Sequence, residues 1–177
     1  MTVTGKGNFS GSVKKTYTMS KQPLDVSRVT LSWSSKAYNG DVQKPTVTVK
    51  NAAGLRLTEG TSYTLEWSGD SKLPGSYTVT VTGKGSFSGS VSKTYTISKQ
   101  PLDASRVTLS WTSKAYNGSV QKPAVTVKNA AGLTLTEGTS YTLTWSGDST
   151  APGTYTVTVK AKGEKYSGSV SKTYSIK

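Results

Sequence analysis

An internal repeat constrains the fold of this chain more than any other feature of its sequence. The segment Val3–Gln22 recurs with few changes at Val81–Gln100, a shift of about 78 residues. The same shift carries Trp33 onto Trp111, and it holds along the stretch between the two segments. A partial third copy occupies Ala161–Lys177, with one extra residue near its start. The chain is therefore built from copies of one structural unit.

The repeat divides the chain into two whole units and part of a third. We predict domains at residues 23–98 and 101–177, and we interpret residues 1–20 as the closing hairpin of a truncated upstream repeat. Each whole unit exceeds the period of most solenoid repeats and is long enough to bury a core of its own. The expected organisation is a row of small domains.

Within one unit the apolar residues alternate with polar ones, which predicts half-buried strands. Asn39-Gly40 and Pro74-Gly75 are among the turn signals between them. About seven strands are predicted, and antiparallel strands with one apolar face each favour two packed sheets. The fold class is thus all-β, with tandem Ig-like antiparallel β-sandwich domains. The strands expected in the first unit are Arg28–Trp33, Lys36–Tyr38, Thr46–Lys50, Leu55–Leu57, Ser62–Trp67, Ser76–Thr82 and Val91–Ile97.

The chain contains no cysteine and no histidine, so it can form no disulfide and lacks the residues that most metal sites and acid–base catalysis at neutral pH use. Most protein metal sites and most nucleophile–base pairs need one of these two residues. A glycosidase would need only two carboxylates, but the acidic residues recur as copies in predicted turns. We therefore expect a protein that is not an enzyme and that carries no cofactor.

The formal net charge is +13, from 22 basic against 9 acidic residues. Such a balance attracts polyanions in general, whether nucleic acid, cell-wall polymer or acidic membrane. The lysines are spread along the chain and form no run of five or more, so specific nucleic-acid binding is not expected. Binding of an anionic wall polymer remains an alternative that this charge motivates.

The strings of residues around the predicted turns resemble a known family. These strings are Tyr38-Asn39-Gly40, the segment Gln43–Val49, the segment Leu57–Tyr63 and the segment Pro74–Gly85. They resemble bacterial Ig-like repeats of large surface proteins in Gram-positive bacteria, and the resemblance covers essentially the whole chain. It implies an extracellular protein of the cell surface or cell wall in which copies form a stalk, and it supplies no catalytic residues.

Two functions are therefore expected as alternatives. The first is a structural spacer, in which repeats form the stalk of a secreted surface protein or adhesin and contact mainly neighbouring repeats. The near-identity of the units favours it, because a spacer needs length rather than distinct sites. The alternative is a binding module for a glycan or an anionic wall polymer, which would need lysines on one face or an exposed aromatic cleft.

Lys93 and its counterpart Lys172 lie in the inward phase of a predicted strand. A buried lysine beside an asparagine and a carboxylate could form an intramolecular isopeptide crosslink. The competing interpretation is an edge-strand lysine that protects the edge from mispairing. Intact mass separates the two, since the crosslink releases ammonia of about 17 Da. The partners would be Asn39 or Asn51, with Glu59 or Asp25 as the helper acid.

The aromatic residues fall mostly in the inward phase, which favours a core over a glycan-stacking platform. Phe9, Phe87 and Tyr166 are exceptions, because they lie in Gly/Ser-rich hairpin tips. For these three we expect inter-domain contacts rather than a ligand site.

The linkers between units are short, and the segments Lys21–Asp25 and Lys99–Asp103 each contain one proline. A proline restricts the backbone, so a fairly stiff array is expected. The hairpin at residues 1–20 has an apolar face and cannot be stable alone in water. It could therefore pair with another molecule and give head-to-tail self-association.

Overall fold

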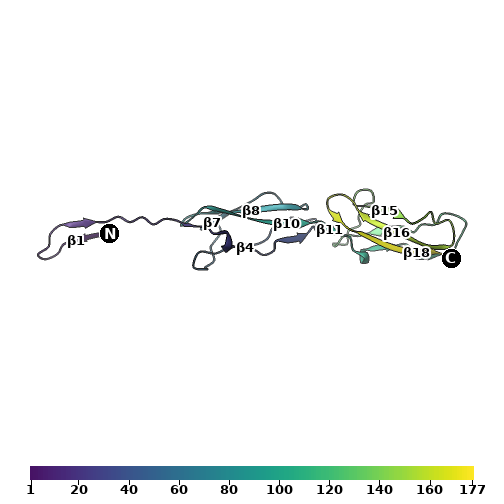
Figure 1. The fold of residues 1–177 in the computed structure, drawn as a ribbon, viewed down its shortest axis with the longest axis horizontal. Helices are drawn as coiled ribbons and strands as arrows, with labels where there is room; N and C mark the ends of the chain where they lie inside the picture. The colour runs from purple at the N-terminus through teal and green to yellow at the C-terminus, as the bar shows by residue number, and fades with distance from the viewer. The chain divides into compact units, whose positions relative to one another are not determined.

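The computed structural model describes all residues from Met1 to Lys177, and its regular structure is almost entirely β (Figure 1). The only helical elements are two single turns of 3-10 helix, η1 (Val26–Arg28) and η2 (Ala104–Arg106). The predicted class, an all-β chain of tandem β-sandwich repeats, is confirmed. The backbone contacts define two compact units. The first is Met1–Thr30 with Thr48–Glu66 and Thr80–Ser92; the second is Leu31–Val47 with Trp67–Val79 and Lys93–Lys177.

The first repeat contains a four-stranded sheet in the order β5-β10-β8-β7 and two short ladders, β4-β6 and β3-β9. The long strands are those whose alternation is clearest in the sequence, which is why they were predictable. The bounds are β3 (Gln22–Pro23), β4 (Val29–Leu31), β5 (Ser35–Ala37), β6 (Val47–Val49), β7 (Tyr63–Trp67), β8 (Gly75–Gly83), β9 (Phe87–Ser88) and β10 (Ser90–Ser98).

The second repeat has the same topology, with the sheet β13-β18-β16-β15 and the ladders β12-β14 and β11-β17. Strands β15, β16 and β18, green to yellow in Figure 1, lie side by side and pair antiparallel. The bounds are β11 (Gln100–Pro101), β12 (Val107–Leu109), β13 (Ser113–Lys114), β14 (Val125–Val127), β15 (Tyr141–Trp145), β16 (Gly153–Ala161), β17 (Tyr166–Ser167) and β18 (Ser169–Ile176).

Two details differ from the sequence prediction. The edge strand β5 pairs with β10 in parallel, and β13 pairs with β18 in the same way, so the sheets are not wholly antiparallel. The segment Leu55–Leu57 forms only a single bridge, between Arg56 and Lys50, rather than a strand. Leu55 is 65% exposed, so the apolar side chain that suggested a strand there does not reach the core.

The core of the second repeat lies between its two layers. Val157 and Val159 on β16 are 0% exposed, while Val107 on β12 and Val127 on β14 are 1% exposed. Val107, Val127 and Val159 belong to one cluster of buried side chains. Burial of these valines follows the period of two that places alternate residues of a strand on one face.

The aromatic side chains of the second repeat pack around Tyr174, near the end of β18. The ring of Tyr174 is 2% exposed; Trp111 and Trp145 meet it edge-on, with centroids 5.5 and 5.7 Å away, and Tyr155 stacks on it at 5.7 Å. Its hydroxyl lies 2.5 Å from the Oγ of Ser149, which is fully buried and has a φ of +60°. Trp111 and Trp145 are themselves half-buried, and Lys114 and Lys122 lie over their rings with Nζ 5.6 and 5.4 Å from the centroids.

The hairpin formed by β1 (Thr2–Thr4) and β2 (Ser12–Lys14) is a two-stranded sheet by itself. Its predicted apolar face is open, with Val3 56%, Val13 64% and Met19 88% exposed. Self-association through residues 1–20 stays a prediction.

Gly83 ends β8 at a place where a side chain has no room. A Cβ there would stand 2.6 Å from the amide nitrogen of Ser88 and 2.9 Å from the carbonyl carbon of Phe87. The second repeat carries Ala161 at this position, and its hairpin is one residue longer. The extra residue therefore lies in the same hairpin as the added methyl group of Ala161. We infer that the longer loop makes the space for it.

We expect Gly83→Ala to destabilise the first repeat by about 1–3 kcal/mol, because the hairpin backbone must move. Inserting one residue between Gly85 and Phe87 in the same variant should restore most of the loss. The midpoint of urea unfolding measures both effects. Ala161→Gly is the matched control and should cost about 1 kcal/mol or less. An alanine tolerated at residue 83 without the insertion would contradict the steric explanation.

Candidate functional site

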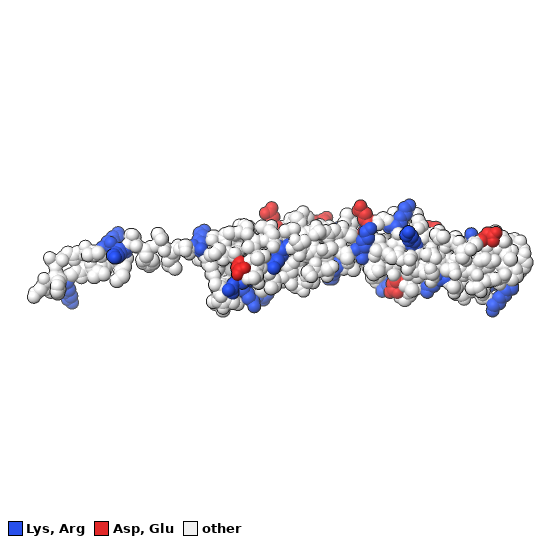
Figure 2. Space-filling view, in the orientation of Figure 1, with Lys and Arg blue, Asp and Glu red and all other residues white.

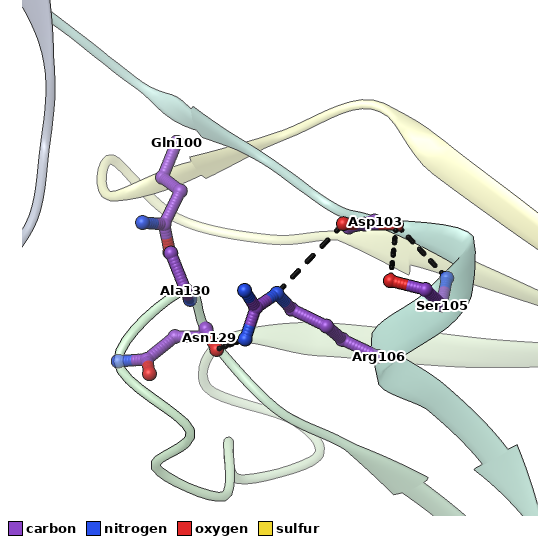
Figure 3. Close-up of polar contacts among 6 residues, drawn as sticks. All are labelled: Gln100, Asp103, Ser105, Arg106, Asn129 and Ala130. Atoms are coloured by element: carbon purple, nitrogen blue, oxygen red, sulfur yellow. Dashed lines mark hydrogen bonds and ion pairs between the residues drawn. The ribbon is translucent and has the colours of Figure 1, made fainter.

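The surface at the start of the second repeat contains a set of polar contacts among Gln100, Asp103, Ser105, Arg106, Asn129 and Ala130 (Figure 3). Strand β11 runs parallel to β17, with the Gln100 amide donating to the carbonyl of Lys165 at 2.9 Å and the Leu102 amide to that of Ser167 at 2.9 Å. This pairing joins the linker between the repeats to the last hairpin of the second repeat by hydrogen bonds. The proline at residue 101 is accommodated because β11 has only one partner strand.

Asp103 and Arg106 fix the short helix that follows β11 (Figure 3). The Oδ1 of Asp103 accepts hydrogen bonds from both the amide and the Oγ of Ser105, each at 2.9 Å. The guanidinium of Arg106 donates from Nη1 to the carbonyl of Asn129 at 3.1 Å, and its Nε lies 3.7 Å from Asp103 Oδ2. Because both charged side chains are well exposed, this ion pair positions the loop more than it stabilises the repeat.

Gln100 is the buried member of this surface, at 9% exposure. Its Oε1 accepts from the Ala130 amide at 3.3 Å, and its Nε2 donates to the carbonyl of Tyr38 at 3.0 Å. Both ends of the side-chain amide are therefore satisfied, one by its own repeat and the other by a residue of the first repeat. Gln100 and Tyr38 both belong to the second compact unit.

Tyr166 completes the contact. Its side chain is 8% exposed, and its ring meets that of Tyr38 edge-on, with centroids 6.1 Å apart and an interplanar angle of 84°. A hollow of about 260 Å³ beside Tyr166 is lined in part by Ala37, Gln100 and Leu135. Edge-to-face aromatic pairs stabilise a contact beyond the area they bury. We refer to Gln100, Tyr166 and Tyr38 together as the joint.

The start of the first repeat carries the same framework. Asp25 accepts from the Ser27 amide at 2.8 Å, and Arg28 donates to the carbonyl of Asn51 at 3.1 Å. A hollow of about 250 Å³ is lined by Gln22, Phe87 and their neighbours. The framework is therefore a property of the repeat, whereas the contact to a tyrosine ring occurs only in the second copy.

The helix-capping aspartates have lowered pKa values. In Asp103 the main cause is the hydrogen bond from the Ser105 amide, followed by that from the Ser105 hydroxyl. Asp25 has its pKa lowered in the same way by Ser27. In contrast, burial raises the pKa of Tyr63 and Tyr141, and a nearby glutamate adds to the effect.

A lowered carboxyl pKa means that the folded state favours the charged form, so this stabilisation is present at neutral pH and is lost as the pH falls below about 4 through the folded pKa. Asp103→Ala should therefore lower the melting temperature at neutral pH, and the difference from the parent chain should shrink near pH 2. Thermal melts at the two pH values measure this. Glu66→Gln removes a charge from an exposed strand position without a hydrogen bond and is the control. An Asp103→Ala loss that is equal at both pH values would contradict the pKa argument.

The three aromatic residues singled out in the sequence occupy different environments. Phe9 is 79% exposed, Phe87 is half-buried on β9, and Tyr166 is buried against Tyr38. Sequence reasoning missed Gln100 and Tyr38. The signal that could have identified Gln100 is the recurrence of a glutamine directly before the proline of both linkers, at Gln22 and Gln100.

The two candidate crosslink lysines, Lys93 and Lys172, are half-buried on β10 and β18. The structure does not bring their amino groups into hydrogen-bond distance of an asparagine side chain. Asn51 uses its Oδ1 to accept from the Leu55 amide at 2.9 Å, and Asn39 accepts from the Asp41 amide at 2.9 Å. The crosslink stays a prediction for intact mass to test.

No three acidic side chains gather into a group that could hold a metal ion. None of the helical turns has the length and apolar character that crossing a membrane requires.

The fold and the joint together define a class of protein: tandem β-sandwich repeats that share one topology, with contacts between consecutive copies. The comparison with protein families also finds two copies of one domain. The model of the MBG domain matches residues 27–101 and again 105–177. The chain therefore belongs to the MBG domain family, a tandem repeat domain typical of bacterial surface proteins. No curated protein matches the sequence.

Proposed function

We propose that the chain is a non-catalytic spacer in which consecutive repeats form the stalk of a surface protein or adhesin. The protein would be secreted and held at the cell surface or in the cell wall of a Gram-positive bacterium. The observation that carries this proposal is the joint: Gln100 uses its side chain to link its own repeat to Tyr38 of the preceding one. A residue placed for a neighbouring repeat is of use in an array and not in a single domain.

The distribution of charge favours the spacer over a binding module. On the face in Figure 2 the lysine and arginine side chains are dispersed, with acidic side chains among them. A site for an anionic polymer would gather several basic groups in one place to release counterions together. Each tryptophan, which could stack on a glycan, is half-buried: it packs edge-on against Tyr95 or Tyr174 and has a lysine ammonium over its ring at 5.2–5.8 Å. A glycan would have to displace these lysines to stack there.

The test compares the two functions directly. A purified polyglycerol-phosphate polymer is immobilised, and retention of the whole chain is measured near 0.15 M salt, where diffuse attraction between separated charges is largely screened. A spacer should not be retained. Retention at this salt concentration, abolished by substituting the lysines of one repeat with glutamine, would establish the binding module instead. In parallel, chains with additional repeats should gain the same increment of maximum dimension per repeat in small-angle scattering.

A further inference from the structure

Two tyrosines at matching positions of the two repeats differ in their surroundings. Tyr38 is 9% exposed and Tyr116 is 47% exposed. Their local backbone is alike, since the Tyr38 amide donates to the carbonyl of Ser98 at 2.8 Å and the Tyr116 amide to that of Lys177 at 2.6 Å. The difference in exposure therefore does not come from the repeat's own fold.

What covers Tyr38 is the start of the second repeat. Tyr166 packs on its ring, and Gln100 donates to its carbonyl. At Tyr116 neither group is present, so the ring is open and the carbonyl has no such donor.

The complementary face, at the start of the first repeat, is also open. Gln22 and Phe87, which match Gln100 and Tyr166, are both half-buried, whereas Gln100 and Tyr166 are buried. Leu57 and Leu135 differ in the same way, since Leu57 is half-buried and its counterpart Leu135 is 8% exposed. The chain thus carries one occupied joint and the two unpaired halves of another.

We propose that the surface around Tyr116 is a docking site for the starting face of a further copy of this repeat. The incoming copy would place its glutamine amide on the Tyr116 carbonyl and its hairpin aromatic, Phe87 or Tyr166, on the Tyr116 ring. The occupied joint supplies the template, because the same residue types already make these contacts once in this chain. The inference rests on the proposed spacer function and adds the identity of the partner and the contacts that select it.

The test extends the whole chain by a second copy of residues 99–177 placed directly after Lys177, which recreates the joint sequence. Hydroxyl-radical footprinting then compares the modification rate of Tyr116 with and without the extension. We expect the rate to fall roughly five-fold, in proportion to the exposures of 47% and 9% at the two tyrosines. Tyr38 in the same molecule is the internal standard for a covered ring.

A matched control carries alanine at the positions of the added copy that correspond to Gln100 and Tyr166. In this variant the Tyr116 rate should return toward that of the unextended chain. A second extension, with residues 21–98 in place of 99–177, tests whether phenylalanine serves as well as tyrosine. A folded extension that leaves the Tyr116 rate unchanged would overturn the proposal, as would two extensions that stay unfolded, since a docked neighbour should support folding. Neither readout involves a polymer, so failure here is distinct from failure of the spacer proposal.

Discussion

Tyr95→Ala is expected to unfold the first repeat at room temperature. The ring of Tyr95 is 1% exposed and contacts three other aromatic rings, with Trp33 and Trp67 edge-on at 5.5 and 5.7 Å and Tyr77 stacked at 5.8 Å. Truncation of a buried aromatic residue to alanine costs about 3–5 kcal/mol. A domain of this size has a total stability close to that range, so little would remain.

Near-ultraviolet circular dichroism and urea unfolding followed by tryptophan fluorescence measure this loss. Trp33 and Trp67 report on the first repeat, while Trp111 and Trp145 report on the second. The aromatic signal of the first pair should collapse while that of the second pair persists. A Tyr95→Ala chain whose first repeat keeps its unfolding midpoint would show that the aromatic cluster is not the centre of the core.

Tyr95→Phe separates the ring from its hydroxyl. The hydroxyl is hydrogen-bonded to Ser71, which is fully buried. Phenylalanine keeps the packing but leaves the Ser71 hydroxyl without this partner, at a cost of about 1–3 kcal/mol. The conservative variant should therefore fold with lowered stability. Tyr174→Phe should behave in the same way in the second repeat, where Ser149 is the partner.

The alternation of side chains predicted the core well, because burial on one face is what a period of two encodes. Val79, Val81 and Ile97, all expected to face inward, are at most 1% exposed. The same pattern could not predict that β5 runs parallel to β10, since alternation says nothing about the direction of a partner strand. Nor could it show that Leu55 points to solvent, because a short apolar run looks alike in a strand and in a loop.

The site was harder to predict than the fold. The backbone of Ser71 has a φ of +57°, a conformation that glycine usually provides, and only the structure places its hydroxyl on Tyr95. Gln100 looked like a linker residue because its partners, Ala130 and Tyr38, are far away in sequence. Contacts of this kind depend on which surfaces the fold brings together, and no local pattern records them.

Tyr38→Ala should destabilise the chain more than Tyr116→Ala, although both remove the same residue from the same loop. The two side chains differ in exposure, 9% against 47%, and the added cover on Tyr38 includes Tyr166. An aromatic side chain buries about 150–250 Å² at about 25 cal/mol per Å², so this difference corresponds to about 2 kcal/mol. Urea unfolding of the two variants, compared with the parent chain, measures it.

A double-mutant cycle between Tyr38→Ala and Tyr166→Ala assigns the effect to the joint. The two rings meet edge-on at 6.1 Å, and such a pair should give a coupling energy of about 0.5–1.5 kcal/mol. The cycle between Tyr116→Ala and Tyr166→Ala is the control and should give no coupling, because the ring of Tyr116 has no aromatic partner there. Equal losses from Tyr38→Ala and Tyr116→Ala would contradict this account, since the repeats would then be stable independently of the contact. A coupling confined to Tyr38 would instead mean that the two repeats stabilise each other through the contact between Tyr38 and Tyr166.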